Sequence, residues 1–415
     1  MSAAASTGFS QRLDGVRVGY LGAVAFGHCS IDILNAAVAI CLTALVARFD
    51  LNNAELAWGI TFYFVMASLP MPLFGILADR WDGRWLAQIG VLWTAVAFLF
   101  VPFIPTYPLL LAVLAVAALG SAAFHATGTR TASLSGGVRH ASFSTSIFFF
   151  LGQIGLSTGP IIAGVLIREF GLMGITYMAL GVLPMVAIMQ YLLYRPMPPV
   201  QAVATLDTKA TRNRAARVAR SALVIAPTIF ILYVVTRSAT LQNFMSLLPK
   251  YFADQGLDSA GYGARAGALV LGGSLGTLAG GLLDGRLRRK HLMMWSLWLS
   301  IPFLYLTLNQ DGVYYYLSAA LAGFVSNTSH SVIVVQAQAM LPKREGLASG
   351  LALGVMFASG AVMTGVAGLF ADIFTLRAVM YTLAFLPILA GALLLIPTRA
   401  PAPTPTLTPS PGPAN

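Results

Sequence analysis

The sequence predicts an all-α membrane protein in which twelve transmembrane helices form two six-helix halves related by pseudo-two-fold symmetry. Of its 415 residues, 57% are hydrophobic and only 9% are charged, and the mean hydropathy of +0.78 lies far above that of soluble globular domains. Apolar runs of about 20 residues, long enough to cross a bilayer core as helices, recur from end to end. The second half also repeats a pattern of polar and small residues of the first half, which predicts the two-fold arrangement.

The apolar runs define the helices in order. Inside hydrocarbon no water satisfies the backbone polar groups, so each uninterrupted run is expected to form a helix. The predicted spans are residues 17–46, 54–78, 85–104, 107–133, 141–167, 171–194, 222–248, 262–284, 291–308, 313–340, 346–370 and 377–396. The polar start of the chain lacks the pattern of a cleavable signal peptide, so we expect the first span to remain as an anchor.

The basic residues predict the orientation of these spans. With the amino terminus inside, 19 of the 25 Lys and Arg residues fall in cytoplasmic segments, and one falls inside a span. The opposite loops hold the other five, Arg48, Arg168, Lys250, Arg265 and Arg377. By the positive-inside rule, we expect an integral protein of a bacterial-type inner (plasma) membrane with both termini in the cytoplasm. The same distribution accounts for the net charge of +11 without a nucleic-acid partner.

One long polar connection divides the spans into six and six. Residues 195–221 open with three prolines and close with a basic run. We therefore expect a cytoplasmic linker there, between an N-terminal half at residues 1–194 and a C-terminal half at residues 222–396. The tail, residues 397–415, is rich in Pro, Thr and Ala, a composition that cannot bury a core, and is expected to be disordered.

A shift of 205 residues lays the second half on the first without gaps. The coinciding pairs are Gly75 and Gly280, Asp79 and Asp284, Arg84 and Arg289, Ser121 and Ser326, His125 and His330, Arg139 and Arg344, and Gly155 and Gly360. At the same register Asp32 coincides with Arg237, so an acid in the first half has a base as its counterpart. Duplicated halves of this kind are typical of a large class of secondary transporters, which bind substrate near the midplane between the halves.

A charged loop between the second and third spans reads Gly-Ile-Leu-Ala-Asp-Arg-Trp-Asp-Gly-Arg at residues 75–84. It resembles the signature cytoplasmic loop of the major facilitator superfamily, and a weaker copy occupies residues 280–286. A carboxylate at a helix end can pair with an arginine or a helix N-terminus, and breaking such contacts would open the inner face. The alternative is that these charges only anchor the orientation. The predicted gating residues are Gly75, Asp79, Arg80, Arg84, Asp284 and Arg286.

Further segments resemble one branch of that superfamily. Span four contains Ala-Phe-His-Ala-Thr-Gly-Thr-Arg at residues 123–130, and residues 341–350 read Leu-Pro-Lys-Arg-Glu-Gly-Leu-Ala-Ser-Gly. With the His and Asp of span one and the Ala-Asp pair that ends with Asp372 in span eleven, these segments look like the fosmidomycin-resistance branch. The resemblance implies proton-driven export of small organic molecules. This chain has Ala126 and Thr127 where that branch commonly has a proline, often followed by an acid.

Span five contains Gly-Leu-Ser-Thr-Gly-Pro at residues 155–160, followed by Gly164. The segment resembles the antiporter motif of drug exporters in the superfamily. Glycines four residues apart let helices pack closely, and Pro160 releases a backbone hydrogen bond, which can create a bend. The resemblance favours export, while close helix packing alone is the alternative.

An ionisable stripe lies within span one. His28, Asp32 and Asn35 are spaced i, i+4, i+7, which places them on one face of a helix. Ionisable side chains at membrane depth are costly and usually mark an ion or substrate path. Histidine titrates near neutral pH, so we predict that His28, Asp32 and the span-four His125 couple transport to protons. A permanent structural ion pair in span one is the alternative.

Span seven carries the matching stripe, Tyr233, Arg237 and Thr240. An unpaired guanidinium within a span is expensive, so we expect Arg237 to pair in alternation with Asp32 and an anionic substrate, or else to form a fixed salt bridge. The symmetry-related histidines, each with a serine one turn earlier, are expected to line a central cavity. The predicted substrate-binding residues are Asn35, Ser121, His125, Gln153, Tyr233, Arg237, Thr240, Asn327 and His330.

Some kinds of chemistry are not expected. Adjacent residues of a helix point about 100° apart, so His28 and Cys29 are a poor chelating pair, and we expect no metal site. The sequence has no phosphate-binding loop, so we expect no nucleotide and no other cofactor. No nucleophile with an accompanying base emerges among the few buried polar groups, so we do not expect an enzyme.

The leading hypothesis is therefore proton-coupled export of small organic compounds by two halves that rock about a central site. The alternative within transport is a proton symporter that imports a small organic acid or anion attracted by Arg237. A receptor or non-transporting scaffold is the hypothesis from another class. The expected partners are a small organic substrate, protons and the lipid bilayer, and we expect a monomer.

Overall fold

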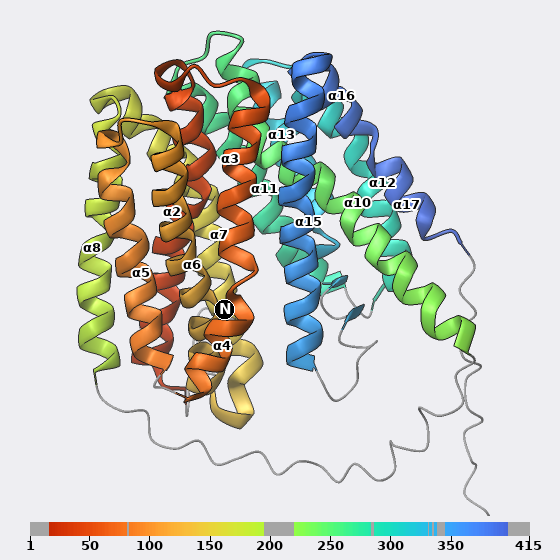
Figure 1. The fold of residues 1–415 in the computed structure, drawn as a ribbon. Helices are drawn as coiled ribbons and strands as arrows, with labels where there is room; N and C mark the ends of the chain where they lie inside the picture. Colours follow the sequence, from red (N-terminus) through yellow and green to blue (C-terminus); the bar gives the residue numbers. More distant parts are fainter. Residues whose placement is uncertain are drawn as a thin grey trace, which may run out of the picture.

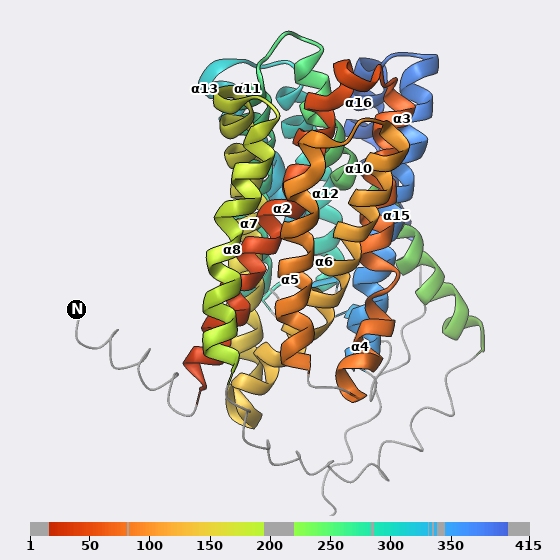
Figure 2. The ribbon, with the colours of Figure 1, turned by 60° about the vertical axis from the view of Figure 1, so that its left-hand side comes forward.

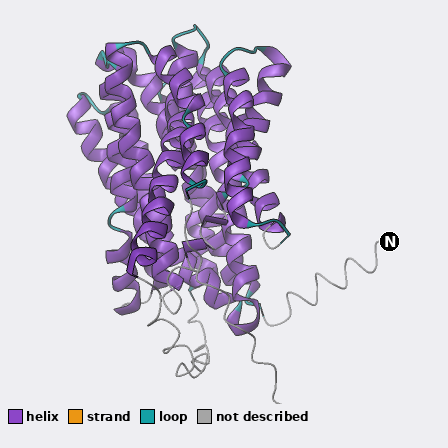
Figure 3. Cartoon of the chain, turned by 90° about the vertical axis from the view of Figure 1, so that its right-hand side faces the viewer, coloured by secondary structure: helices purple, strands orange, loops and turns teal. Residues whose placement is uncertain are grey.

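The computed structural model describes residues 16–80, 83–194, 220–283, 286–330, 332–333, 336–337 and 345–396, and nearly all of them are helical (Figures 1 and 3). The N-terminal half consists of α2 (Val18–Phe49), α3 (Asn53–Ser68), α4 (Met71–Arg80), α5 (Gly83–Phe100), the short 3-10 helix η1 (Val101–Phe103), α6 (Tyr107–Ser135), α7 (Gly137–Phe170) and α8 (Met173–Leu193). The C-terminal half consists of α10 (Arg220–Ala253), α11 (Ser259–Leu283), α12 (Arg289–Thr307), α13 (Gly312–Asn327), α15 (Glu345–Ile373), α16 (Leu376–Phe385) and α17 (Pro387–Leu393). The predicted all-α architecture of twelve spans in two halves is confirmed.

Two predicted spans are interrupted at prolines. Span two is divided into α3 and α4 by a turn at residues 69–70, and span twelve into α16 and α17 immediately before Pro387. A proline has no backbone N–H, and its ring clashes with the carbonyl four residues earlier, so a long run can break there. The residues before the two prolines, Leu69 and Leu386, nevertheless keep right-handed helical backbone angles. Span ten leaves α13 at Asn327, and a turn at residues 328–329 precedes His330.

The boundaries of the predicted domains remain predictions. Residues 195–219 of the linker and the whole Pro-rich tail, residues 397–415, lie outside the described residues. Helix α10 begins at Arg220, within the last two residues of the predicted linker. Among the described residues, eight helical segments are long and apolar enough to cross a membrane by length and composition alone.

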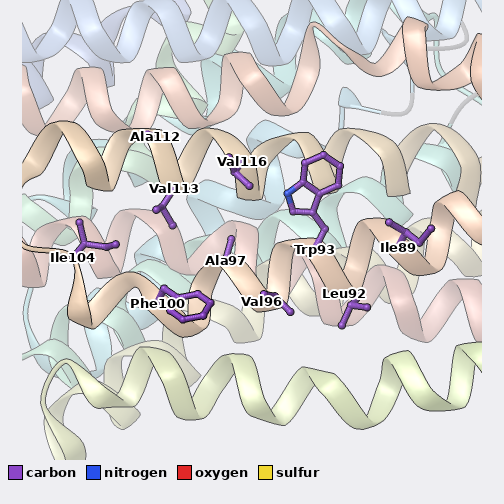
Figure 4. A pocket seen from close by; sticks show the side chains of 10 residues that line it. All are labelled: Ile89, Leu92, Trp93, Val96, Ala97, Phe100, Ile104, Ala112, Val113 and Val116. Atoms are coloured by element: carbon purple, nitrogen blue, oxygen red, sulfur yellow. The ribbon is translucent and has the colours of Figure 1, made fainter.

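The core and the outer surface suit a bilayer. Tyr63, Phe98 and Phe124 are among the large side chains that are fully buried between helices, whereas many large apolar side chains are exposed on the outside. Such an outer surface would be a liability in water and fits hydrocarbon. A groove between α5 and α6 belongs to this surface, because its ten lining residues, from Ile89 to Val116, are all apolar (Figure 4).

The two halves meet along two helix pairs, α3 with α15 and α7 with α11 (Figures 1 and 2). We call the end of the bundle where α2 ends and α3 begins the upper end, as it is drawn in Figure 1. There the two carboxylate oxygens of Asp372 accept hydrogen bonds from the backbone N–H groups of Asn53 and Ala54, each at 2.9 Å. Further along the same pair, Thr61 Oγ1 donates to the carbonyl oxygen of Ala361 at 2.6 Å.

The second helix pair is equally close. Ser259 Oγ, at the start of α11, donates to the carbonyl oxygen of Gly164 in α7 at 2.9 Å. A Cβ atom at Gly263 would lie 2.4 Å from the carbonyl oxygen of Pro160, so only glycine allows this approach of the two helices. The upper end of the bundle is thus joined across the halves on both sides.

Candidate functional site

The structure brings His28, Asp32 and His125 together in one buried cluster of the N-terminal half. His28 and Asp32 lie one turn apart on α2, with Nε2 of His28 3.2 Å from Oδ2 of Asp32. His125 reaches the same carboxylate from α6, with its Nε2 3.2 Å from Oδ1. His28 and Asp32 are each 4% exposed, and the His125 side chain is 20% exposed. The three residues predicted for proton coupling therefore form a single group.

The second nitrogen of each imidazole also faces an acceptor. Nδ1 of His28 lies 2.8 Å from the carbonyl oxygen of Phe148, and Nδ1 of His125 lies 2.9 Å from the carbonyl oxygen of Ser121. A backbone carbonyl can only accept, and a neutral imidazole carries a single N–H. His28 therefore needs two protons to bond at both nitrogens, unless Asp32 is protonated and donates to its Nε2. Nδ1 of His125 also lies 3.3 Å from Oγ of Ser121, a hydroxyl that can donate to it, so a neutral His125 can still bond at both nitrogens.

The geometry of the cluster limits where its protons lie. Two imidazolium cations with one carboxylate carry one net positive charge, and so do one imidazolium, one neutral imidazole and one protonated Asp32. Removing the proton between His28 and Asp32 leaves a nitrogen lone pair of His28 facing an oxygen lone pair at hydrogen-bond distance. Because such a contact is repulsive in a low-dielectric interior, loss of that proton must change the geometry at His28.

Asn35 extends the cluster on the side of α3. Its Nδ2 donates to Oδ1 of Asp32 at 2.9 Å and to Oγ of Ser121 at 3.0 Å. Its Oδ1 accepts a 2.6 Å hydrogen bond from the hydroxyl of Tyr63, a fully buried residue of α3. The predicted residues Asn35 and Ser121 thus belong to the proton cluster. Tyr63 was missed, because a tyrosine in an apolar span is usually a core residue.

Arg237 does not pair with Asp32 in this conformation, and the expected alternation between Asp32 and a substrate remains a prediction. The guanidinium is 2% exposed and donates to Oγ of Ser329 at 3.2 Å, to Oδ1 of Asn327 at 3.2 Å and to the carbonyl oxygen of Ser326 at 3.4 Å. Its Nη1 also lies 3.4 Å from Sδ of Met356. The cation thus lies at the C-terminus of α13, where helix carbonyls favour positive charge. No carboxylate of the described residues lies within 4.0 Å of it.

The pseudo-symmetry of the sequence reappears as two separate polar centres. In the N-terminal half, Asp32 of α2 meets His125 of α6. In the C-terminal half, Arg237 of α10 meets the end of α13, the counterpart of α6. The contacts are not equivalent in detail, because the partners Ser326, Asn327 and Ser329 coincide with residues 121, 122 and 124 and not with His125, but each charge is bonded within its own half.

The other predicted substrate-binding residues are distributed around these centres. The hydroxyl of Tyr233 donates to the carbonyl oxygen of Met293 at 3.2 Å, and Thr240 is 1% exposed with no hydrogen-bond partner for its hydroxyl among the described residues. Gln153 of α7 accepts from Oγ of Ser274 across the halves. His330 follows the turn that Arg237 contacts. Whether these residues bind substrate remains a prediction.

The predicted gating residues are only partly described. A Cβ atom at Gly75 of α4 would meet nothing within 4 Å, so close packing at this glycine is not observed here. Arg286 lies in an exposed turn after α11. The side chains of Asp79, Arg80 and Arg84, and the whole of Asp284, lie outside the described residues, so the gating role of the loop stays a prediction.

The cluster also has the composition of a cation site. The nitrogen and oxygen atoms of His28, Asp32 and His125 lie within 4.8 Å of one another, which could hold a metal ion. Their hydrogen bonds, however, already engage both imidazole rings and both carboxylate oxygens. The expectation that these residues hold no metal remains a prediction.

Comparisons with known proteins agree with this architecture. The family model for the Major Facilitator Superfamily matches residues 24–262 and 229–413. Over 390 residues the chain is 27% identical to the fosmidomycin resistance protein of Escherichia coli (strain K12), covering 91% of this chain and 93% of that protein. Over 377 residues it is 25% identical to YfnC, an uncharacterized transporter of Bacillus subtilis (strain 168), covering 89% and 91%. The crystal structure of a bacterial homologue of the human lysosomal transporter Spinster, inward-facing and occupied, shares the fold with a TM-score of 0.74 at 12% identity, covering 90% of this chain and 95% of that chain.

Proposed function

Because the chain belongs to the Major Facilitator Superfamily, we propose that it is a proton-coupled secondary transporter that exports small organic compounds by alternating access. As a member of this family it is an integral membrane transporter of small molecules and not an enzyme. Proton coupling, the direction of transport and the inner-membrane location with cytoplasmic termini belong to the proposal.

The buried cluster of His28, Asp32 and His125 carries the proposal. With both imidazoles protonated it holds one net positive charge, and the proton between His28 and Asp32 can leave only if the His28 ring or the carboxylate moves. If the geometry of the cluster depends on its protons, the proton binds with different affinity to the state open at one end of the bundle and to the state open at the other. Proton binding then shifts the equilibrium between these two states. The partial exposure of His125 provides the side from which a proton or a substrate can reach the cluster.

Two observations support export over import. The relative from Escherichia coli is named for resistance to fosmidomycin, and it aligns with 91% of this chain. Resistance is the outcome expected when a membrane transporter removes a compound from the cell. In addition, the segment that resembles the antiporter motif lies in α7, where Gly164 and Pro160 contact α11 of the other half.

Import of a small organic anion is the second candidate, and Arg237 favours it. Its guanidinium is buried in the C-terminal half and meets only uncharged groups among the described residues. A buried cation without a carboxylate is costly, and an anionic group on a substrate would compensate it. The same contact would also serve export of an anionic compound, so direction must be measured separately.

Transport in membrane vesicles of both orientations tests the proposal, with fosmidomycin as the first probe. In inverted vesicles with an acidic lumen, an exporter accumulates the probe, and a protonophore abolishes the accumulation. In right-side-out vesicles, the import alternative predicts gradient-driven accumulation of a small organic acid instead. If folded protein produces no gradient-dependent flux of fosmidomycin or of a panel of organic acids in either orientation, proton-coupled transport is refuted.

A further inference from the structure

Helix α7 lies between the proton cluster and the C-terminal half. It packs against α2 on one side and against α11 on the other. The side that faces α2 is a stripe of small residues, Gly152, Gly155 and Gly159. A Cβ atom at Gly155 would lie 2.2 Å from the carbonyl oxygen of Cys29, so the backbones of the two helices are in direct contact here.

The first glycine of the stripe lies on the imidazole of His28. A Cβ atom at Gly152 would lie 2.4 Å from Cε1 and 2.6 Å from both Nδ1 and Nε2 of that ring, and its three nearest neighbours are all atoms of His28. One turn earlier, Phe148 accepts the Nδ1 proton with its carbonyl oxygen and stacks its own ring on His28, with centroids 4.0 Å apart at 23°. His28 is therefore held against α7 by a hydrogen bond, a ring stack and a space that only glycine leaves open.

The opposite side of α7 touches the other half at the next residue along the chain. Oγ of Ser274 in α11 lies 3.3 Å from the carbonyl oxygen of Gln153 and 3.4 Å from its Oε1, and 3.0 Å from the carbonyl oxygen of Val270 in its own helix. Its single proton can donate to one of these three oxygens at a time. Further up, a Cβ atom at Gly267 of α11 would lie 2.9 Å from the carbonyl oxygen of Ser157 and 2.5 Å from Cγ1 of Ile161. Because α7 and α11 are closely packed, a displacement of α7 at His28 also changes its contact with α11.

We propose that Gly152 and Phe148 are positioning residues that hold His28 against α7, so that proton loss from the cluster moves α7 relative to α11. This inference rests on the proposed proton coupling. The titratable groups that the structure places around His28 are Asp32 on its own helix and His125 of α6, while α7 contributes a carbonyl, aromatic rings and a glycine. When the proton between His28 and Asp32 leaves, His28 no longer bonds at both nitrogens, and the ring turns from the surface that Gly152 leaves open.

The first test is Gly152→Ala, measured as transport driven by a pH gradient and as its dependence on pH. The added methyl group displaces the His28 ring, so we expect gradient-driven flux to fall by roughly 2- to 30-fold, the range typical of residues that couple two sites. We also expect the pH profile of transport to shift. Gly22→Ala is the matched control, because a Cβ atom at this glycine of α2 would meet nothing within 4 Å, and it should change neither quantity. An unchanged flux and pH profile in Gly152→Ala would overturn the proposal.

A stability cycle separates this inference from the proposed function. Gly152→Ala should lower the thermal midpoint of the purified protein when His28 is present, and should lower it much less in a His28→Ala background, because the ring that the methyl group meets is gone. Equal losses in the two backgrounds would refute the positioning role even if proton-driven transport is established. If Gly152→Ala alone does not fold, recovery of folded protein in the double variant supports the inference, and its failure to recover overturns it. Absence of gradient-driven flux in the unaltered protein would instead refute the proposed function.

Discussion

Replacing Asp372 with asparagine should favour opening of the upper end of the bundle. Asp372 ends α15, and its two carboxylate oxygens accept hydrogen bonds from the backbone N–H groups of Asn53 and Ala54 at the start of α3. The carboxylate therefore satisfies two of the N–H groups that the first turn of a helix leaves unpaired, and places a negative charge at the positive end of the helix. An asparagine removes the charge and can accept with one oxygen only.

The magnitude follows from these two contacts. A hydrogen bond to a charged group contributes about 1.5–3 kcal/mol when buried and a neutral one about 0.5–1.5 kcal/mol. Asp372 is exposed, so solvent screening reduces the difference, and the interaction of an anion with a helix N-terminus adds about 0.3–1 kcal/mol. We expect the conformational equilibrium to shift by about 1–2 kcal/mol, or roughly 5- to 30-fold, toward the state in which α3 and α15 separate.

Spin labels at Phe103 and Val313 can measure this shift. Both residues are exposed, at 61% and 71%, and they lie in different halves, one in η1 and one at the start of α13. Pulsed dipolar measurements should show longer label distances in Asp372→Asn than in the unaltered chain. Glu169→Gln is the control, because Glu169 pairs with its neighbour Arg168 on α7. Identical distance distributions with and without the Asp372 substitution would show that these two hydrogen bonds do not hold the upper end of the bundle closed.

Two further substitutions test the polar centres. Tyr63→Phe removes the donor to Oδ1 of Asn35 and should cost about 1 kcal/mol of stability, measured as a lower thermal midpoint. Tyr191→Phe, at a tyrosine that is 81% exposed, is the control and should leave the midpoint unchanged. Equal midpoints for the two variants would contradict the hydrogen bond between Tyr63 and Asn35. Exchanging charges by Asp32→Arg with Arg237→Asp should not restore the yield of folded protein above that of either single variant, because each residue is bonded within its own half. A clear rescue would mean that the two charges do pair in another conformation.

The sequence predicts the architecture well because the bilayer constrains it strongly. Apolar runs of about 20 residues, basic loops and a constant shift of 205 residues are sufficient to predict two six-helix halves. The sequence shows Pro70 and Pro387 but does not predict that the helices break there, because neighbouring helices often compensate for a proline within a membrane.

The proton cluster is only partly predictable. Helical spacing places His28 and Asp32 on one face, and the repeat singles out His125, but only the packing of α6 against α2 brings the second histidine to the carboxylate. The carbonyl of Phe148 is a backbone acceptor and has no signature in the sequence. Packing also decides the partners of Arg237 in this conformation, since a shared register indicates equivalent positions and says nothing about contact.

Asp32 is proposed to carry the coupling proton together with two histidines, and transport by purified protein in liposomes tests this role. Asp32→Asn keeps the size of the side chain and its bond to Asn35, but it removes the charge that both imidazoles face. We predict that uptake driven by a pH gradient is lost, while exchange of labelled for unlabelled substrate without a gradient is retained in part. If Asp32→Asn instead shows gradient-driven uptake at the level of the unaltered protein, Asp32 does not carry the coupling proton.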